Sequence, residues 1–165
     1  MKAGIALGSN VGDRLHNLRR AREAIARLAT NGETIGSPIY ETEAVNCELD
    51  APPFYNAILE LDYNGSACEL LRHLRTIEAE LGRPADHPRN QSRTIDLDLL
   101  YFGEEQIDTP ELRLPHPRLQ ERQFVLAPLA DIRADLVLPN QSRSVAELLA
   151  HLDDPARVVR ANEQW

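Results

Sequence analysis

Two aspartates one residue apart lie in an otherwise apolar stretch, SRTIDLDLLYF, which spans residues 92–102. Because strand side chains alternate between faces, a strand here places Asp96 and Asp98 on one face, with their α-carbons about 6.5–7 Å apart. Two carboxylates at this spacing repel each other unless a cation lies near them. Mg²⁺ commonly takes one or two carboxylates together with water and substrate phosphates. The pair therefore indicates a magnesium site, and simple polar alternation on a solvent-facing strand is the alternative.

Arginines gather in the same middle part of the chain, although the formal net charge of the whole chain is −8. They are Arg83, Arg89, Arg93, Arg113, Arg118 and Arg122. The guanidinium group matches phosphate oxygens with its forked donors, and carboxylates for Mg²⁺ beside arginines for phosphate suit phosphoryl transfer. Taken singly, each arginine could equally be a solvated surface residue. The acidic balance argues against a general nucleic-acid binder, and the lack of a GxxxxGK[ST] stretch excludes a P-loop enzyme.

The elements that must position these groups follow from apolar spacing and turn residues. We expect strands at 2–7, 34–40, 54–63, 94–102, near 107 and at 136–138. We expect helices after Asp13, Ser66 and Ser144, the last two opened by capping boxes with Glu69 and Glu147. The order β-α-β-β-α-β is that of the ferredoxin-like, split-βαβ motif. The predicted fold class is therefore α+β, a mainly antiparallel sheet packed with helices, plus a C-terminal extension.

Length and composition indicate a single domain spanning residues 1–165. The 42% hydrophobic and 27% charged shares are ordinary for a soluble globular protein. No apolar run approaches a membrane span, and the N-terminal stretch resembles a first strand more than a secretory signal. Cys47 and Cys68 have neither metal-ligand nor disulfide-framework spacing, so a cytoplasmic location is expected.

Five motifs in register resemble those of the 6-hydroxymethyl-7,8-dihydropterin pyrophosphokinase family of folate synthesis. They are GSN at 8–10, FYNA at 54–57, GR at 82–83, RTIDLDLL at 93–100 and PHPRLQERQFVLAPL at 115–129. Their order and spacing match along essentially the whole chain. The resemblance implies transfer of the β,γ-diphosphate of ATP to the hydroxymethyl group of the pterin, with release of AMP. We also expect a monomer that acts on small molecules, with no nucleic-acid or membrane partner.

The resemblance further implies which residues handle the nucleotide. Asp96 and Asp98 hold two Mg²⁺ ions that bridge them to the ATP phosphates. Arg83 and Arg93 match family arginines associated with the nucleotide and its phosphates, and both are expected to act in catalysis. His116 and Arg122 match positions that contact the triphosphate. Without the register of the motifs, His116 would be interpreted as a turn residue and Arg122 as a surface ion-pair partner.

The pterin side is interpreted partly from chemistry. Phe54 and Asn56 share one strand face, and together they offer a stacking ring and an amide with both a donor and an acceptor. Phe124 matches the second stacking aromatic of the family, and Thr42 and Val45 match the loop that borders the pterin. By composition alone, Phe54 and Phe124 would be ordinary core residues.

The chain departs from the family pattern mainly in the loop at 83–93. Asn90 and Ala85 stand where some members have tryptophan and arginine, so we expect Arg89 to contribute more to nucleotide binding. Glu43 stands where some members have proline, and Phe54 where some have tyrosine. The altered loop motivates one alternative to the active enzyme, a non-catalytic ATP- or pterin-binding homologue. A ferredoxin-like regulatory or nucleic-acid module is a further alternative, and the net acidity and the paired aspartates argue against it.

Overall fold

The computed structural model describes residues 1–44, 51–82 and 92–165. Its main sheet has the strand order β5-β1-β4-β3-β8, with β2 pairing to β4 outside this path, and all of its described ladders are antiparallel. The strands are Lys2–Ser9 (β1), Thr34–Gly36 (β2), Tyr40–Thr42 (β3), Phe54–Asp62 (β4), Asp96–Phe102 (β5) and Val158–Arg160 (β8). Ile107–Asp108 (β6) and Arg113–Leu114 (β7) form a separate small ladder.

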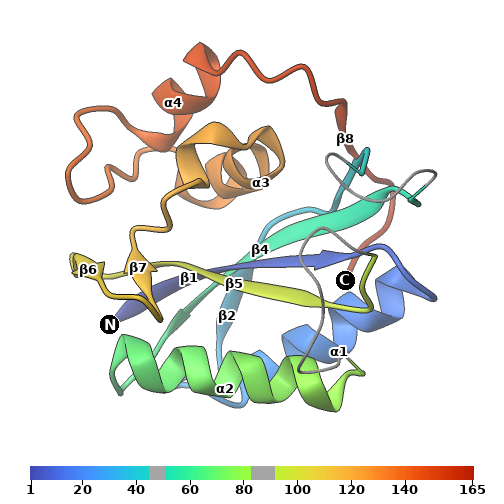
Figure 1. The fold of residues 1–165 in the computed structure, drawn as a ribbon, viewed down its shortest axis with the longest axis horizontal. Helices are drawn as coiled ribbons and strands as arrows, with labels where there is room; N and C mark the ends of the chain where they lie inside the picture. Colours follow the sequence, from blue (N-terminus) through green and yellow to red (C-terminus); the bar gives the residue numbers. More distant parts are fainter. Residues whose placement is uncertain (45–50, 83–91) are drawn as a thin grey trace.

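Helices cover both faces of the main sheet (Figure 1). Arg14–Ala26 (α1) and Ala67–Glu80 (α2) lie on one face. Gln123–Arg133 (α3) and Val145–His151 (α4) lie on the other, after the single 3-10 turn Leu119–Glu121 (η1) of the described chain. This arrangement confirms the predicted α+β class and the β-α-β-β-α-β core.

Local sequence signals fix the helix ends as expected. Asp13 caps α1 by accepting from the backbone N–H of His16 at 3.0 Å. Ser66 and Glu69 form the predicted capping box of α2, and Ser144 forms the equivalent one with Glu147 for α4. Such caps satisfy backbone donors that have no partner within the helix, so short polar stretches determine where each helix begins.

The alternation of side chains between the two faces of the sheet is interrupted in the middle of β5. Asp96 pairs with Gly8 and Asp98 with Ala6, so both aspartates point to the α3 side, whereas Leu97 and Leu99 enter the core formed with α1 and α2. The register with β1 then shifts, and Leu100 is the extra residue of a β-bulge. As a result, Leu100 and Tyr101 both pack toward α3 and α4. The predicted separation of aspartates from apolar residues is confirmed, and the bulge is an addition to it.

Several expected elements differ from those observed. The single strand expected at 34–40 is divided into β2 and β3 around Ser37–Pro38, because proline lacks the N–H that a continuous ladder requires. The strand expected at 136–138 is wrong: Val137 makes only an isolated bridge with Ser144. The short strand near Ile107 exists, but it pairs with β7. Strand β8 was not expected.

Among the described residues, no helix is long and apolar enough to cross a membrane.

Candidate active site

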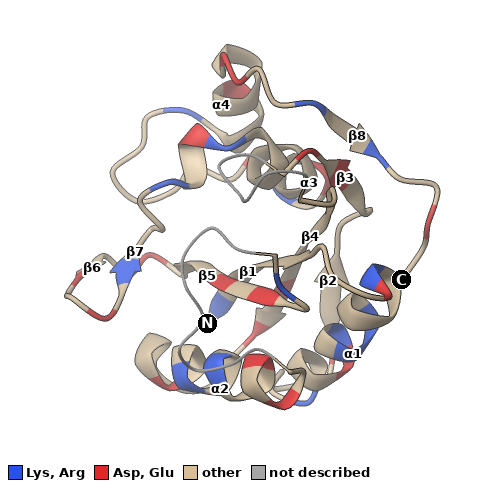
Figure 2. Cartoon of the chain, turned by 45° about the vertical axis from the view of Figure 1, so that its right-hand side comes forward, with Lys and Arg blue, Asp and Glu red and all other residues tan. Residues whose placement is uncertain are grey.

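One row of paired residues crosses the sheet on its α3 side. Asp96 on β5 lies opposite Gly8 on β1, Gly8 lies opposite Asn56 on β4, and Asn56 lies opposite Tyr40 on β3. Directly paired residues of antiparallel strands point to the same face. The row therefore brings a predicted metal ligand and a predicted pterin-binding residue to the same face, with only β1 between them. Figure 2 marks the acidic positions of β5 in this part of the sheet.

Gly8 forms the floor between these two groups. A Cβ atom built there would lie 3.0 Å from Oδ1 of Asn56, 3.7 Å from Cδ1 of Phe54 and 3.9 Å from Cβ of Asp96. Three predicted site residues therefore surround the space above one glycine. The missing side chain leaves room for a flat ligand close to the backbone.

Each aspartate of the pair faces an arginine. Nη1 of Arg93 lies 2.9 Å from Oδ2 of Asp96, and Nη1 of Arg122 lies 3.8 Å from Oδ2 of Asp98. The aspartate side chains are 25% and 40% exposed, so they remain accessible to solvent and to a ligand. Because these partly exposed pairs gain little stability, their arginines can turn to a bound anion at small cost.

The same two arginines also lie against the two predicted stacking rings. The Arg93 guanidinium carbon lies 5.9 Å from the ring centroid of Phe54, and that of Arg122 lies 5.5 Å from the ring centroid of Phe124. Both distances fall within the range of cation–π contacts. The predicted phosphate-binding arginines and the predicted pterin-stacking rings are thus immediate neighbours in this structure.

His116 lies between β7 and η1, where its backbone N–H donates to the carbonyl of Leu100 at 2.7 Å. Burial, together with the charges of Arg122 and Arg118, lowers the pKa of His116 to about 4, against the opposing effect of Asp96. The imidazole is therefore neutral at pH 7. Its Nδ1 accepts from the backbone N–H of Arg118 at 3.2 Å, which assigns the proton to Nε2 and makes that nitrogen a donor.

Arg122 is also affected by its surroundings. Burial, followed by the charge of Arg118, lowers its pKa, and the carboxylates of Asp98 and Asp96 oppose this shift. Arg93 and Arg118 both lie close enough to Arg122 to act on its charge, so three positive charges gather around Arg122, which itself lies beside Asp98. An excess of positive charge in a partly buried site favours an anionic ligand.

The predicted pterin-binding residues Thr42 and Asn56 are directly bonded. Nδ2 of Asn56 donates to Oγ1 of Thr42 at 2.7 Å, and both side chains are buried. The bond fixes the orientation of the amide and leaves its oxygen over Gly8. Phe54 and Phe124 are half-buried, on β4 and at the start of α3 respectively.

Asn10 is a structural residue of this site that the sequence interpretation missed. Its Oδ1 accepts from the backbone N–H of Arg93 at 2.8 Å, and its Nδ2 donates to Oγ of Ser92 at 2.9 Å and to the carbonyl of Pro52 at 3.2 Å. Its backbone N–H donates to the carbonyl of Arg93 at 3.2 Å. Asn10 therefore joins the segments that precede β4 and β5. The GSN motif at 8–10 contains Asn10, but the motif alone does not show which distant segments this side chain joins.

Three predicted residues lie outside the described part of the chain. Val45 belongs to 45–50, and Arg83 and Arg89 belong to 83–91, together with the altered positions Ala85 and Asn90. Their assignments stay predictions.

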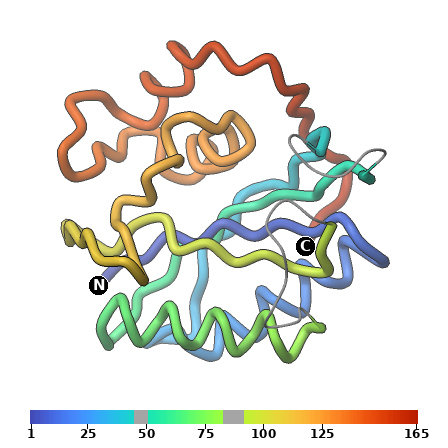
Figure 3. Tube along the Cα trace, in the orientation of Figure 1, coloured from blue at the N-terminus to red at the C-terminus, as the bar shows by residue number. Residues whose placement is uncertain are grey.

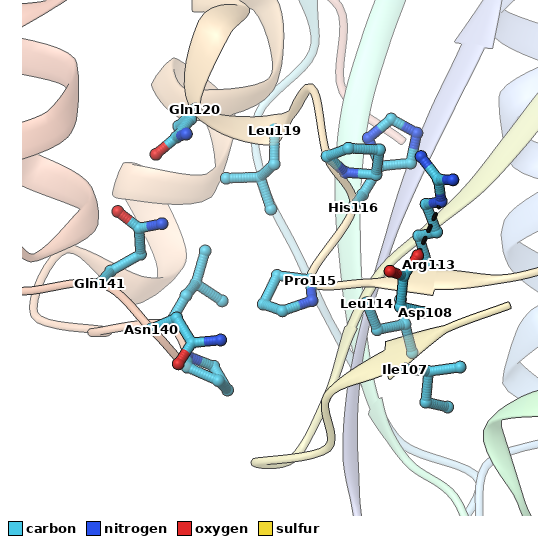
Figure 4. A pocket seen from close by; sticks show the side chains of 13 residues that line it. Ile107, Asp108, Arg113, Leu114, Pro115, His116, Leu119, Gln120, Asn140 and Gln141 are labelled. Atoms are coloured by element: carbon cyan, nitrogen blue, oxygen red, sulfur yellow. Dashed lines mark ion pairs between the residues drawn. The ribbon is translucent and has the colours of Figure 1, made fainter.

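Two pockets border the site without including the aspartate pair. One, of about 280 Å³, lies between the β6–β7 hairpin and the 138–141 segment, with His116 on its wall (Figure 4). The other, of about 450 Å³, lies along β3 and β8 and includes Thr42.

In the described ranges, no group of three or more histidine, cysteine, aspartate or glutamate side chains could hold a metal ion. A metal bound at Asp96 and Asp98 would therefore need water or substrate oxygens as further ligands.

Comparison with known proteins decides the family. The family model described as 7,8-dihydro-6-hydroxymethylpterin-pyrophosphokinase matches residues 4–134. The chain belongs to this family. Relatives within the pyrophosphokinase family include the 2-amino-4-hydroxy-6-hydroxymethyldihydropteridine pyrophosphokinases of Pseudomonas aeruginosa, 42% identical over 146 residues, and of Bacillus subtilis, 47% identical over 130 residues. The first alignment covers 88% of each chain, and the second covers 79% of this chain and 77% of the relative.

Solved pyrophosphokinase structures agree at the level of the fold. The wild-type HPPK-DHPS of Plasmodium falciparum with pteroate matches 90% of this chain with a TM-score of 0.72 and 16% sequence identity. The match spans 42% of that longer chain. At this identity the likeness shows the shared fold only, and it confirms the ferredoxin-like architecture of the family.

Proposed function

We propose that the chain transfers the β,γ-diphosphate of ATP to the hydroxymethyl group of 6-hydroxymethyl-7,8-dihydropterin and releases AMP, as a step of folate synthesis. Membership of the pyrophosphokinase family supports this reaction. The single observation that carries it is the convergence of Asp96, Phe54 and Asn56 around the side-chain-free Gly8. No observation on the described residues favours the non-catalytic alternative.

Asp96 and Asp98 are the proposed ligands of two Mg²⁺ ions. Both are partly exposed carboxylates on one face of β5, beside cations that suit phosphate, and this donor set fits a hard cation that retains water and phosphate ligands. Bound Mg²⁺ neutralises phosphate charge and lowers the pKa of a nearby hydroxyl.

The arginines and His116 bind and orient the triphosphate. Arg93 and Arg122 exchange their present contacts with Asp96 and Asp98 for phosphate oxygens, to which the forked guanidinium group is well matched. Neutral His116 donates its Nε2–H and adds no further positive charge. Arg83 and Arg89 act with them in our proposal, on the strength of the family motif alone. Positioning and electrostatics then supply most of the rate enhancement.

The pterin ring lies between Phe54 and Phe124 in this proposal. Asn56, held by Thr42, pairs with the polar edge of the ring, and Val45 completes the border on the basis of the motif. In the reaction, the hydroxymethyl oxygen forms a bond to the β-phosphorus. The bond between that phosphorus and the α–β bridging oxygen breaks, AMP leaves, and the hydroxyl proton passes to solvent.

We treat residues 1–165 as one pyrophosphokinase domain that acts as a cytoplasmic monomer. The two apolar clusters, which flank the main sheet, support the single domain. Light scattering of the purified chain tests the monomer, since a stable dimer would double the measured mass.

Incubation of the protein with the pterin, ATP and Mg²⁺, followed by chromatographic measurement of AMP, tests the function. We expect AMP only when both the pterin and Mg²⁺ are present. Folded protein that forms no pterin-dependent AMP while retaining ATP or pterin binding would instead support the non-catalytic alternative.

A further inference from the structure

The first turn of α3 is capped by a residue far along the chain. Its own N-cap residue, Arg122, makes no side-chain cap bond. The backbone N–H of Gln123 instead donates to Oδ2 of Asp154 at 3.0 Å, and that of Ala156 donates to Oδ1 of the same carboxylate at 3.0 Å. A carboxylate at a helix N-terminus satisfies a donor without an intrahelical partner and interacts favourably with the helix dipole. Asp154 therefore acts as a remote cap, held in place by its own turn.

The segment that carries Asp154 continues onto the edge of the sheet. Val158 pairs with Thr42 and Arg160 with Tyr40, so that β8 covers the outer edge of β3. Beyond it, Ala161 donates its N–H to the carbonyl of Ile39 at 2.8 Å, and the indole of Trp165 donates to the carbonyl of Ser37 at 2.7 Å. Figure 3 follows this segment from α4 past the sheet edge to the end of the chain beside α1. One short segment thus contacts both α3 and β3.

Helix α3 is anchored differently at its other end. The hydroxyl of Tyr40 donates to Oδ2 of Asp131 at 2.7 Å, and Arg133 donates to the buried carboxylate of Glu60. These bonds attach the second half of the helix to the sheet. The first turn, which carries Phe124 beside Arg122, is attached through Asp154. Loss of the Asp154 bond would therefore affect the start of α3 more than its end.

We propose that Asp154 is a positioning residue for the pterin end of the site, acting by holding the first turn of α3 and hence the ring of Phe124. The inference rests on the proposed function of Phe124. It extends beyond the family resemblance, because Asp154 lies outside residues 4–134, which the family model matches. The role of the segment is to fix the distance between α3 and β3, the two elements that carry Phe124 and Thr42.

Two substitutions of Asp154 and one of its neighbour test the proposal. Asp154→Ala removes the acceptor, Asp154→Asn keeps an oxygen that can accept from Gln123, and Asp153→Ala is the matched control at an exposed position. Asp154→Ala should raise the KM for the pterin by about fivefold, as expected for loss of one helix cap, and change kcat and the KM for ATP by no more than about twofold. Asp154→Asn keeps an acceptor for Gln123 but loses the acceptor for Ala156 and the charge, so it should raise the KM for the pterin less than Asp154→Ala does, and Asp153→Ala should behave like the wild type.

Hydrogen exchange gives a second readout that does not depend on catalysis. The amide of Gln123 should exchange faster in Asp154→Ala than in Asp153→Ala, while the second half of α3 exchanges as in the wild type. An unchanged pterin KM in Asp154→Ala, or equal increases in both KM values, would overturn the proposal. If the wild type forms no pterin-dependent AMP, the proposed function fails. In that case unchanged exchange at Gln123 in Asp154→Ala rejects the positioning role, and faster exchange with weaker pterin binding supports it.

Discussion

Asn56 and Thr42 are joined by a hydrogen bond of 2.7 Å between two buried side chains on neighbouring strands. The bond aligns the amide before any ligand is present. A buried amide whose orientation is already fixed loses little conformational freedom when it binds a ring edge.

Replacing Thr42 by valine should therefore damage pterin binding specifically. The substitution keeps the shape of the side chain but removes the acceptor of the Asn56 amide, at a cost of about 1–3 kcal/mol in the free energy of unfolding. The KM for the pterin should rise by about tenfold with little change in the KM for ATP. Steady-state kinetics with each substrate varied gives the measurement. Thr34→Val, on β2 beside the same strand β4, is the control, and equal effects in both variants would contradict the assignment.

Asp96→Asn and Asp98→Asn should each lower kcat by at least about a hundredfold, because each removes a charged oxygen ligand from the proposed magnesium site. Stability should change by no more than about 1 kcal/mol, since both ion pairs are partly exposed. AMP formation as a function of Mg²⁺ concentration, with urea unfolding alongside, measures both effects. Asp108→Asn breaks the exposed ion pair with Arg113 and should leave turnover unchanged. Near-normal rates in either site variant would show that the metal assignment is wrong.

Gly8→Ala should weaken the site by crowding. The added Cβ would lie 3.0 Å from the Asn56 amide oxygen, so the amide must move away from the position that Thr42 gives it. We expect a pterin KM raised by about tenfold or more. Gly36→Ala introduces similar crowding, 3.3 Å from Leu59 on the α1 side of the sheet, and should lower stability without changing the pterin KM. An unaltered KM for the pterin in Gly8→Ala would contradict the placement of the pterin above Gly8.

Glu60 should make stability depend on pH in the acidic range. Burial raises its pKa, but hydrogen bonds from Arg133 and Tyr101 and the charges of Arg133 and Lys2 outweigh burial, so the pKa lies below its ordinary value of 4.5. The unfolded chain therefore binds more protons than the folded one below pH 4.5. The stabilisation is complete above that pH and is lost as the pH falls through the folded-state pKa.

The variant Glu60→Gln tests this dependence. At pH 7 it should unfold about 2–4 kcal/mol more easily than the wild type, because Arg133 and Tyr101 lose a charged partner. The difference should shrink as the pH falls below 4.5. Urea unfolding at several pH values measures it, with the exposed Glu104→Gln as the control. A difference that stays constant down to pH 3 would exclude Glu60 as the group responsible.

The sequence predicted those features that depend on local order. Alternation placed Asp96 and Asp98 on one face of β5 and Leu97 on the other, and the capping boxes at Ser66 and Ser144 began α2 and α4. Both signals involve residues within a few positions of one another, so no knowledge of the fold is needed to interpret them.

Features that depend on distant partners were not predicted. The role of Asn10 requires Arg93 to lie beside it, and the cap by Asp154 requires a segment 31 residues away. Strand β8 is three residues long and forms because β3 offers an edge. The apolar spacing at 136–138 resembled a strand but reflects the packing of Leu136 and Leu138 against α3 and α4. Propensity is weak evidence where tertiary contacts decide the outcome.

Because of the bulge at Leu100, the directions of the side chains before it do not determine the directions of those after it in β5. Before the bulge, the side chains alternate so that Asp96 and Asp98 point to the α3 side of the sheet. Downstream, the extra residue turns Tyr101 toward Glu60 and over the bare backbone of Gly4. Deletion of Leu100 would restore regular alternation and keep Tyr101 opposite Gly4 on the α3 side, so only the side chain of Leu100 would be lost from the packing against α3 and α4, while the pairing of Asp96 with Gly8 stays in register. An insertion or deletion at this one position thus alters the packing against α3 without moving the carboxylates of Asp96 and Asp98. At this point of the strand, the helix packing can evolve separately from the residues of the active site.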